Sequence, residues 1–317
     1  MAIKRPEELS FSDKTFSMII YGSPGLGKTT LALSAPDPVL IDFDRGVSRV
    51  KAYHRKLTIE CSTYEEVLND IQSPEVAGCK TIIIDTGGSF VTYLQDWAMR
   101  TNPNVNCQKN GAISLKGFGA VKAEFARFTN YIRDVMHKNI IYVFHSDEQK
   151  DKDGNPIQRL QCEGASRNLV WQPCDLGGYM QMIGNKRVIS FTPETEFFAK
   201  GCYGIEGQRV VPPLTPTTEN DFLTKLFDEA RANITQEQAA FEPVKDQYEA
   251  VMAQVKEIID SITDAASATK AAVDIPALEH ALTSKKEARA MLTAKTKELG
   301  LTWNTKAKEY QAAEAEG

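Results

Sequence analysis

A glycine-rich loop near the start of the chain has the residue types and the spacing that bind phosphate groups. Residues 22–29 read G-S-P-G-L-G-K-T and fit the pattern G-x-x-x-x-G-K-[ST] at every fixed position. Glycines let successive backbone N–H groups point at phosphate oxygens, the lysine reaches the terminal phosphates, and the last hydroxyl binds Mg²⁺. The motif therefore predicts a nucleoside triphosphate site. Its predicted contact residues are Gly22, Ser23, Pro24, Gly25, Leu26, Gly27, Lys28, Thr29 and Thr30.

Asp85 is the predicted second anchor for Mg²⁺, beside Thr29. It closes an apolar run, T-I-I-I-D at residues 81–85, as a metal-binding aspartate at a strand end requires. An aspartate that merely caps the following helix would stand in the same place. ATP is preferred to GTP because no guanine-reading N-K-x-D follows a strand. The predicted cofactors are ATP and Mg²⁺.

Hydrolysis also needs a group that orients or deprotonates the attacking water. Asp42 and Asp44 lie at the end of the strand expected at residues 39–43, and their spacing of two puts both on one face of it. Asp44 is nearer the strand's carboxyl end and is the predicted base, although an ion pair with a neighbouring arginine fits equally well. His145, just beyond another strand, is a candidate sensor of the γ-phosphate or an ordinary loop histidine.

Alternating strands and helices are expected from residue 15 to residue 230, which indicates an α/β domain with a mainly parallel sheet. The predicted strands are residues 15–21, 39–43, 81–85 and 139–144, with crossover helices at residues 64–71 and 121–136. A hairpin at residues 179–191, turning at Gly184-Asn185, predicts an antiparallel end to the sheet.

A helical region is expected after about residue 220, where the sequence becomes rich in Ala, Glu and Lys. The predicted helices are residues 221–232, 242–262, 276–299 and 302–313, with Pro276 in a first helical turn. The predicted domains are therefore an ATPase core at residues 1–219 and a helical C-terminal region at residues 220–317.

Composition excludes several classes of protein. The net charge is −5 from 37 basic and 42 acidic residues, so bulk positive charge cannot bind nucleic acid and a local basic loop would be needed. No apolar run approaches the roughly 20 residues of a membrane span, and the N-terminus lacks the apolar segment of a secretory signal. The six scattered cysteines predict reduced thiols, and a cytoplasmic location is expected.

The order of these parts resembles the RecA/Rad51-like P-loop ATPases, most closely the phage-encoded recombinases of the single-strand annealing type. Four segments carry the likeness: the loop at residues 22–29, the strand end at residues 41–46, the strand ending in Asp85, and G-F-G-A-V-K-A-E-F at residues 117–125. The resemblance spans about residues 10–215. It implies a RecA-like core that binds ATP and Mg²⁺ and a homo-oligomeric ring or filament on single-stranded DNA. It also implies a location in the cytoplasm of a phage-infected bacterial host.

The resemblance also assigns roles to particular residues. The family's base is usually glutamate, so the shorter Asp44 predicts slow hydrolysis. The family's DNA-contacting loops correspond to residues 99–119 and 146–175, and in the second of these Trp171 is the one aromatic side chain available to stack on a base. The predicted DNA contacts are Lys150, Lys152, Arg159 and Arg167, although nearby acidic residues equally allow a solvated loop. Lys200 corresponds to the cation that a neighbouring subunit places against the γ-phosphate, or is an exposed turn lysine.

The leading hypothesis is an ATP-dependent DNA-recombination protein that promotes annealing or strand exchange. Another P-loop enzyme, such as a helicase, a packaging motor or a kinase-like protein, would hydrolyse ATP with a duplex or transfer phosphate to a small acceptor. A nucleotide-gated adaptor would bind a replication partner, such as a single-strand-binding protein, through its C-terminal helices. Those helices could equally pack on the core or dimerise.

Overall fold

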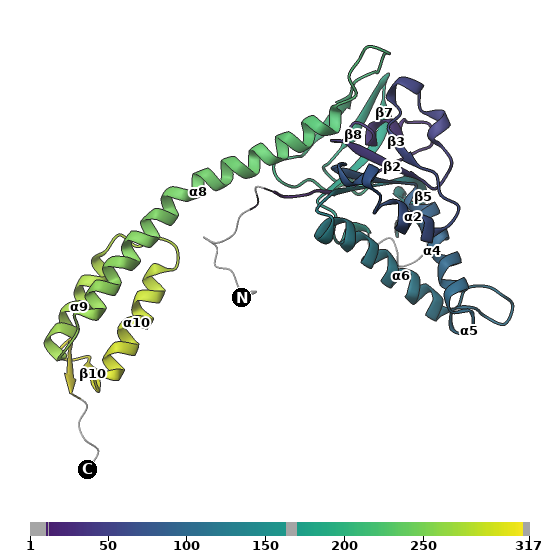
Figure 1. Cartoon of the computed structure of the whole chain (residues 1–317). Helices are drawn as coiled ribbons and strands as arrows, with labels where there is room; N and C mark the ends of the chain where they lie inside the picture. The colour runs from purple at the N-terminus through teal and green to yellow at the C-terminus, as the bar shows by residue number, and fades with distance from the viewer. Residues whose placement is uncertain (1–10, 12, 163–169, 313–317) are drawn as a thin grey trace. The chain divides into compact units, whose positions relative to one another are not determined.

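The computed structural model describes residues 11, 13–162 and 170–312 (Figure 1). By its internal contacts the chain divides into two compact units, of which the first is Ser12–Asn233 and the second contains Ile234–Gly317. The predicted DNA contact Arg167 lies outside the described residues. In the described part, no helix is long and apolar enough to cross a membrane. Mixed α/β structure with a mostly parallel central sheet, followed by a helical region, confirms the predicted fold class.

The first unit is built on a nine-stranded sheet in the order β3-β2-β4-β5-β1-β7-β8-β9, with β6 paired to β5. Strands β3 to β7 in that order are parallel, whereas the β7–β8 and β8–β9 pairs are antiparallel, as the hairpin predicted. The strands are β1 Ser17–Gly22, β2 Pro38–Asp42, β3 Leu57–Ile59, β4 Thr81–Asp85, β5 Asn139–Lys150, β6 Pro156–Leu160, β7 Leu176–Ile183, β8 Lys186–Ser190 and β9 Gln208–Val211.

Helices cover both faces of this sheet. The side chains of α2, α4 and α6 pack with alternate residues of the central strands in one aromatic-rich core, in which Phe90 contacts Phe125 and Phe128. On the opposite face, the segment after α1 binds the start of α8, where Leu223 N–H donates to Ser34 Oγ. The helices of this unit are α1 Lys28–Ala32, α2 Tyr64–Asp70, α3 Pro74–Ala77, α4 Gly87–Thr101, α5 Pro103–Asn106 and α6 Leu115–Asn130. The expected loop at residues 99–119 is therefore largely helical.

Local sequence signals explain where the covering helices begin. Thr63 caps α2 through the N–H of Glu66, and the Glu66 carboxylate accepts from the Thr63 N–H, which is a capping box. Ser114 caps α6 through the N–H of Gly117. Each cap therefore fixes the residue at which a loop ends and a covering helix begins.

The helical segments of the C-terminal region differ from the prediction in three ways. The two predicted helices at residues 221–232 and 242–262 are instead one helix, α8 Phe222–Asp260, which continues through Pro243 although a proline there removes one backbone hydrogen bond. The predicted helix at residues 276–299 is instead the end of α9 Ala265–Ala277 and a separate helix, α10 Ser284–Glu298. Asp264 caps α9 through Ser267, so Pro276 lies at the end of this helix rather than at the start.

Residues 302–313, predicted as a helix, instead contain the hairpin of β10 Leu301–Asn304 and β11 Glu309–Ala312. Gly300 adopts a positive φ of 65° directly after α10, a conformation that ends helices. Thr302, Trp303 and Tyr310 are residue types that favour strands. In the second unit, α9, α10 and the later part of α8 surround a small apolar core, and the β10–β11 hairpin packs against it.

Candidate nucleotide-binding site

The glycine-rich loop lies at the edge of the sheet where parallel strands end. It joins β1 to α1, and in the parallel pairing Gly22 lies beside His145 of β5 while Asp85 of β4 lies beside Val143. Gly27 has a φ of 81° and begins α1, and a Cβ at Gly22 would collide with the carbonyl of Met180. Both glycines are therefore required by the backbone, and they expose the amino end of α1 to a ligand.

A cavity of about 450 Å³ opens over this loop. Its volume is within the range of small-molecule sites, and its walls come from the loop, the ends of β4 and β5, and the turn after β2. The lining residues are Pro24, Gly25, Gly27, Lys28, Thr29, Thr30, Asp44, Gly46, Arg49, Val50, Asp85, Thr86, Val143 and His145. The structure thus brings the loop and three other sequence-predicted residues, Asp44, Asp85 and His145, to one cavity.

Lys28 is folded back onto its own loop. Its ammonium donates to the carbonyl oxygens of Gly22, at 3.0 Å, and Ser23, at 2.9 Å, and lies 3.3 Å from His145 Nδ1. Burial lowers the pKa of Lys28 to about 8, although Asp85 opposes the shift. Burial, followed by the Lys28 charge, also lowers the pKa of His145 below its usual value. A protonated Lys28 can only donate, so His145 is neutral and accepts through Nδ1.

Asp85 and Thr29 are hydrogen-bonded, with 2.6 Å between Thr29 Oγ1 and Asp85 Oδ2. Asp85 is 5% exposed, and burial together with the charges of Asp44 and Asp42 raises its pKa to about 6, against the lowering effect of the Thr29 hydrogen bond. In the described residues no ion pair joins Asp85. A buried carboxylate without a cation is costly, so Asp85 is a favourable place for a positive charge to bind.

This pair of oxygens fits Mg²⁺. The ion prefers hard oxygen ligands and is usually bound by one or two protein groups together with phosphate oxygens. No cluster of three or more His, Cys, Asp or Glu side chains that could hold a metal occurs in the parts of the chain that the structure describes. A cation bound by Thr29 and Asp85 would therefore share its remaining ligands with the nucleotide, where it would neutralise phosphate charge.

The two aspartates after β2 have different surroundings. Asp42 is fully buried, and its carboxylate accepts hydrogen bonds from the backbone N–H groups of Gly46, at 2.8 Å, and Val47, at 2.7 Å. Asp44 lines the cavity and accepts from the hydroxyls of Ser89 and Thr86. Asp42 therefore holds the turn, while Asp44 faces the space where a water molecule could be activated.

A second cavity of about 430 Å³ shares Asp44, Thr86 and His145 with the first. Its other lining residues include Ser89, Asp147 and Gln161. The groups proposed to act on the γ-phosphate thus have open space on two sides, one containing the glycine-rich loop and one leading toward β6. The sequence carried no signal for Ser89 or Thr86, because their role depends on α4 starting beside Asp44.

The predicted DNA contacts that the structure describes lie on or near an antiparallel hairpin formed by the end of β5 and by β6. Lys150 and Lys152 are exposed near its turn, whereas the Arg159 guanidinium stacks on the Phe198 ring, 3.8 Å from its centroid. Over residues 146–160 three basic residues meet four acidic ones. This hairpin is therefore not a basic surface. One of its acidic side chains, Asp151, accepts hydrogen bonds from Asn155 and so stabilises the turn.

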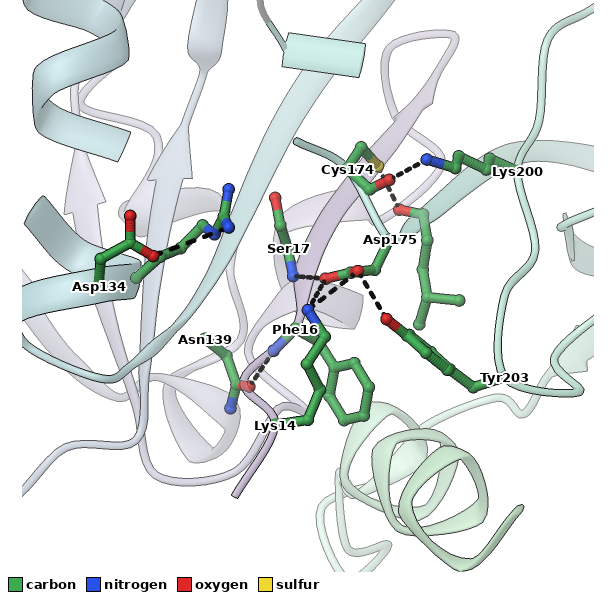
Figure 2. Close-up of polar contacts among 11 residues, drawn as sticks. Lys14, Phe16, Ser17, Asp134, Asn139, Cys174, Asp175, Lys200 and Tyr203 are labelled. Carbon is green, nitrogen blue, oxygen red and sulfur yellow. Dashed lines mark hydrogen bonds and ion pairs between the residues drawn. The ribbon is translucent and has the colours of Figure 1, made fainter. Parts of the chain in front are cut away.

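Lys200 does not line the nucleotide cavity of its own subunit. Its backbone pairs with Gly177, and its ammonium donates to the carbonyl of Cys174, near the amino-terminal ends of β1 and β7 (Figure 2). The glycine-rich loop lies at the carboxyl end of β1. A role for Lys200 at a nucleotide would therefore require the site of another subunit.

Two arginines near the loop were not predicted from the sequence as nucleotide-site residues. Arg49 lines the cavity, and a Cβ placed on Gly27 would lie 3.8 Å from the guanidinium carbon of Arg187. Arg187 is exposed on β8 and reaches the loop because β7 runs parallel to β1 and the hairpin turn lies at the same edge. The sequence did predict the hairpin at residues 179–191. Arg187 could have been predicted as well if the turn of this hairpin had been placed at the edge of the sheet that carries the glycine-rich loop.

A glycine-rich strand–loop–helix with a lysine, a hydroxyl and an opposed strand-end aspartate defines a P-loop nucleotide-binding domain. A family model described as AAA domain matches residues 14–203. The chain therefore belongs to the AAA domain family of P-loop ATPases. No curated protein matches the chain.

Proposed function

We propose that this protein is an ATP-hydrolysing DNA-recombination protein that assembles on single-stranded DNA and promotes annealing or strand exchange. Nucleotide binding and the P-loop fold follow from the family. The finer function rests on the resemblance to phage-type recombinases and on one feature of β5. A homo-oligomer in which Lys200 meets the nucleotide of the next subunit, an optional single-strand-binding partner and a host-cytoplasmic location belong to the same proposal.

The feature that supports it is the continuity of β5, Asn139–Lys150, from the nucleotide cavity to the β5–β6 hairpin. His145 contacts Lys28, and the next residue, Ser146, is already paired with Leu160 of β6. The backbone carbonyl of His145 also accepts from the N–H of Gln161. If a bound phosphate moves the Lys28 ammonium, the contact between Lys28 and His145 changes. His145 is itself hydrogen-bonded next to the β5–β6 hairpin, which carries Lys150.

The residues of the cavity would divide the work of hydrolysis. The loop N–H groups and Lys28 bind and orient the phosphates. For this, the Lys28 ammonium exchanges its hydrogen bonds to the loop carbonyls for hydrogen bonds to phosphate oxygens. Asp44 accepts a proton from the attacking water, while Ser89 and Thr86 hold its carboxylate in place. His145 is neutral, so its contact with Lys28 can change when Lys28 moves without adding positive charge to the cavity.

Binding of fluorescein-labelled oligothymidine, followed by anisotropy with ATP·Mg²⁺, with ADP and without nucleotide, tests the proposal. We expect tight, salt-sensitive binding with ATP that Lys28→Ala reduces to the level seen without nucleotide, and that His145→Ala uncouples from nucleotide without loss of ATP binding. Lys56→Ala, an exposed lysine outside the cavity, is the matched control. ATP binding with no effect of nucleotide on DNA affinity would contradict the proposal, and annealing of complementary oligonucleotides is the next assay if it holds.

A further inference from the structure

The second unit has a surface hollow of about 450 Å³ between the last turns of α10 and the β10–β11 hairpin. The rings of Trp303 and Tyr310, which are cross-strand partners, stand 5.0 Å apart at an interplanar angle of 71°. Tyr310 packs partly against the core of the unit, whereas Trp303 is 43% exposed. The hollow thus presents an exposed indole ring that its neighbour holds in one orientation. Its lining residues are Thr293, Thr296, Lys297, Gly300, Leu301, Thr302, Trp303 and Tyr310.

Positive charge gathers around this hollow. Residues 284–312 hold seven basic and three acidic side chains, a net charge of +4 in a chain whose net charge is −5. Lys297, Lys306 and Lys308 are exposed, and none of them forms an ion pair within the described residues. The basic residues are Lys285, Lys286, Arg289, Lys295, Lys297, Lys306 and Lys308, and the acidic ones are Glu287, Glu298 and Glu309.

The hairpin tip is held rigidly. The Asn304 side-chain oxygen accepts from the N–H groups of Lys306, at 3.0 Å, and Ala307, at 3.1 Å, and the Asn304 carbonyl accepts from Lys308 N–H at 2.9 Å. The N–H of Tyr310 donates to Thr269 of α9, which fixes the hairpin to its unit. The two tip lysines and the indole ring are therefore presented together without the cost of ordering a loop on binding.

We infer that this hollow is a binding site for single-stranded DNA, with one base stacked on Trp303 and phosphates contacted by Lys297, Lys306 and Lys308. An exposed aromatic face beside a row of lysines is the combination that binds unpaired strands, because every base has a flat face and every nucleotide one phosphate. A duplex hides its base faces, which excludes it from stacking here. The choice of DNA rests on the proposed function.

An acidic, apolar peptide is the competing ligand for such a basic hollow. Such a peptide needs a continuous apolar pocket for its hydrophobic residues, whereas in this wall Leu301 and the two aromatic rings are interrupted by three threonines, a glycine and a lysine. The lining residues all lie in the second unit, so binding here requires neither the glycine-rich loop nor ATP. The hollow therefore supplies a nucleotide-independent contact with the strand.

The test combines two variants in the full-length chain: Trp303→Ala and Lys28→Ala, alone and together. Anisotropy of labelled oligothymidine is measured without nucleotide and with ATP·Mg²⁺ at several salt concentrations, and thermal melting checks that each variant folds. We expect Trp303→Ala to weaken binding about five- to a hundredfold in both states, and Trp303→Phe to restore most of it. Lys306→Gln with Lys308→Gln should lower the slope of log affinity against log salt by about 1.4.

Lys285→Gln with Lys286→Gln is the matched control, because it removes the same charge from the other end of α10, and its effect on the slope should be smaller. Unchanged binding by Trp303→Ala overturns the inference, even where Lys28→Ala shows that ATP gates DNA binding. An effect of Trp303→Ala without any effect of Lys28→Ala or ATP supports the inference and contradicts the proposed function. Trp303-dependent binding of a labelled acidic peptide, with none of oligothymidine, overturns the inference.

Discussion

Two aspartates at opposite ends of the central sheet show how surroundings separate a structural carboxylate from a ligand-binding one. Asp175, just before β7, accepts from the Ser17 N–H at 2.9 Å and from Tyr203 Oη at 3.1 Å, and it forms an ion pair with Lys14 at 3.1 Å (Figure 2). Asp85 at the carboxyl end of β4 is more deeply buried, at 5% exposed, but has a single hydroxyl donor, Thr29, and like charges nearby.

The difference shows what each site requires from outside the chain. The protein itself satisfies Asp175, so that carboxylate joins the start of β1 to β7 and has no need of a ligand. Asp85 keeps a raised pKa because its burial outweighs the opposing effects of the Thr29 hydrogen bond and the Lys28 charge. We therefore expect substitutions at the two positions to change the free energy of unfolding in opposite directions.

The largest expected effect is that of Asp175→Ala. It leaves the Lys14 ammonium, the Ser17 N–H and the Tyr203 hydroxyl without their acceptor, and we expect a loss of about 3 kcal/mol in the free energy of unfolding. Urea denaturation measures the loss. Asp228→Ala, which breaks the exposed ion pair with Arg231, is the control and should cost less than about 1 kcal/mol. If both variants lose the same free energy of unfolding, Asp175 contributes no more to stability than an exposed ion pair does.

Asp85→Asn should have the opposite sign in the absence of nucleotide and Mg²⁺. Asparagine keeps an oxygen for the Thr29 hydroxyl but carries no charge to bury, so we expect a gain of about 2 kcal/mol in the free energy of unfolding at pH 7. The Mg²⁺-dependent part of ATP affinity should fall at least about tenfold. Titrating nucleotide with and without Mg²⁺ measures it. A variant less stable than the wild type would show that Asp85 is structural, like Asp175.

The same carboxylate predicts a pH dependence. The folded pKa of Asp85, about 6, is above its ordinary value of 3.8, so the folded state binds the proton more tightly than the unfolded state. The free energy of unfolding of the wild type should therefore fall, relative to Asp85→Asn, as the pH rises from about 4 to about 6, and then stay constant. Denaturation of both proteins between pH 4 and pH 8 checks this. A constant difference across that range would contradict the raised pKa.

The sequence predicted those parts of the site whose residues are neighbours along the chain. Gly22, Lys28 and Thr29 stand in one motif, and the apolar run before Asp85 shows that it ends a strand. The hairpin containing Trp303 was mistaken for a helix because Ala, Glu and Lys dominate the flanking sequence, while its turn depends on one asparagine side chain. The roles of Asp44 as base and of Lys200 in a neighbouring site stay predictions.

Arg187 shows the limit of such reasoning, since its position depends on which strand pairs with β1. Its guanidinium lies against the glycine-rich loop, where it can add a charge-assisted hydrogen bond to a phosphate. We expect Arg187→Ala to weaken ATP binding about five- to tenfold, the smallest of these effects, because the side chain is exposed. Lys186→Ala removes the same charge from the other face of β8 and should have little effect. Calorimetric titration compares the ATP affinities of the two variants. Equal losses of affinity would mean that only the overall positive charge at this edge of the sheet matters. A loss confined to Arg187→Ala would mean that the β7–β8 hairpin forms a wall of the nucleotide site.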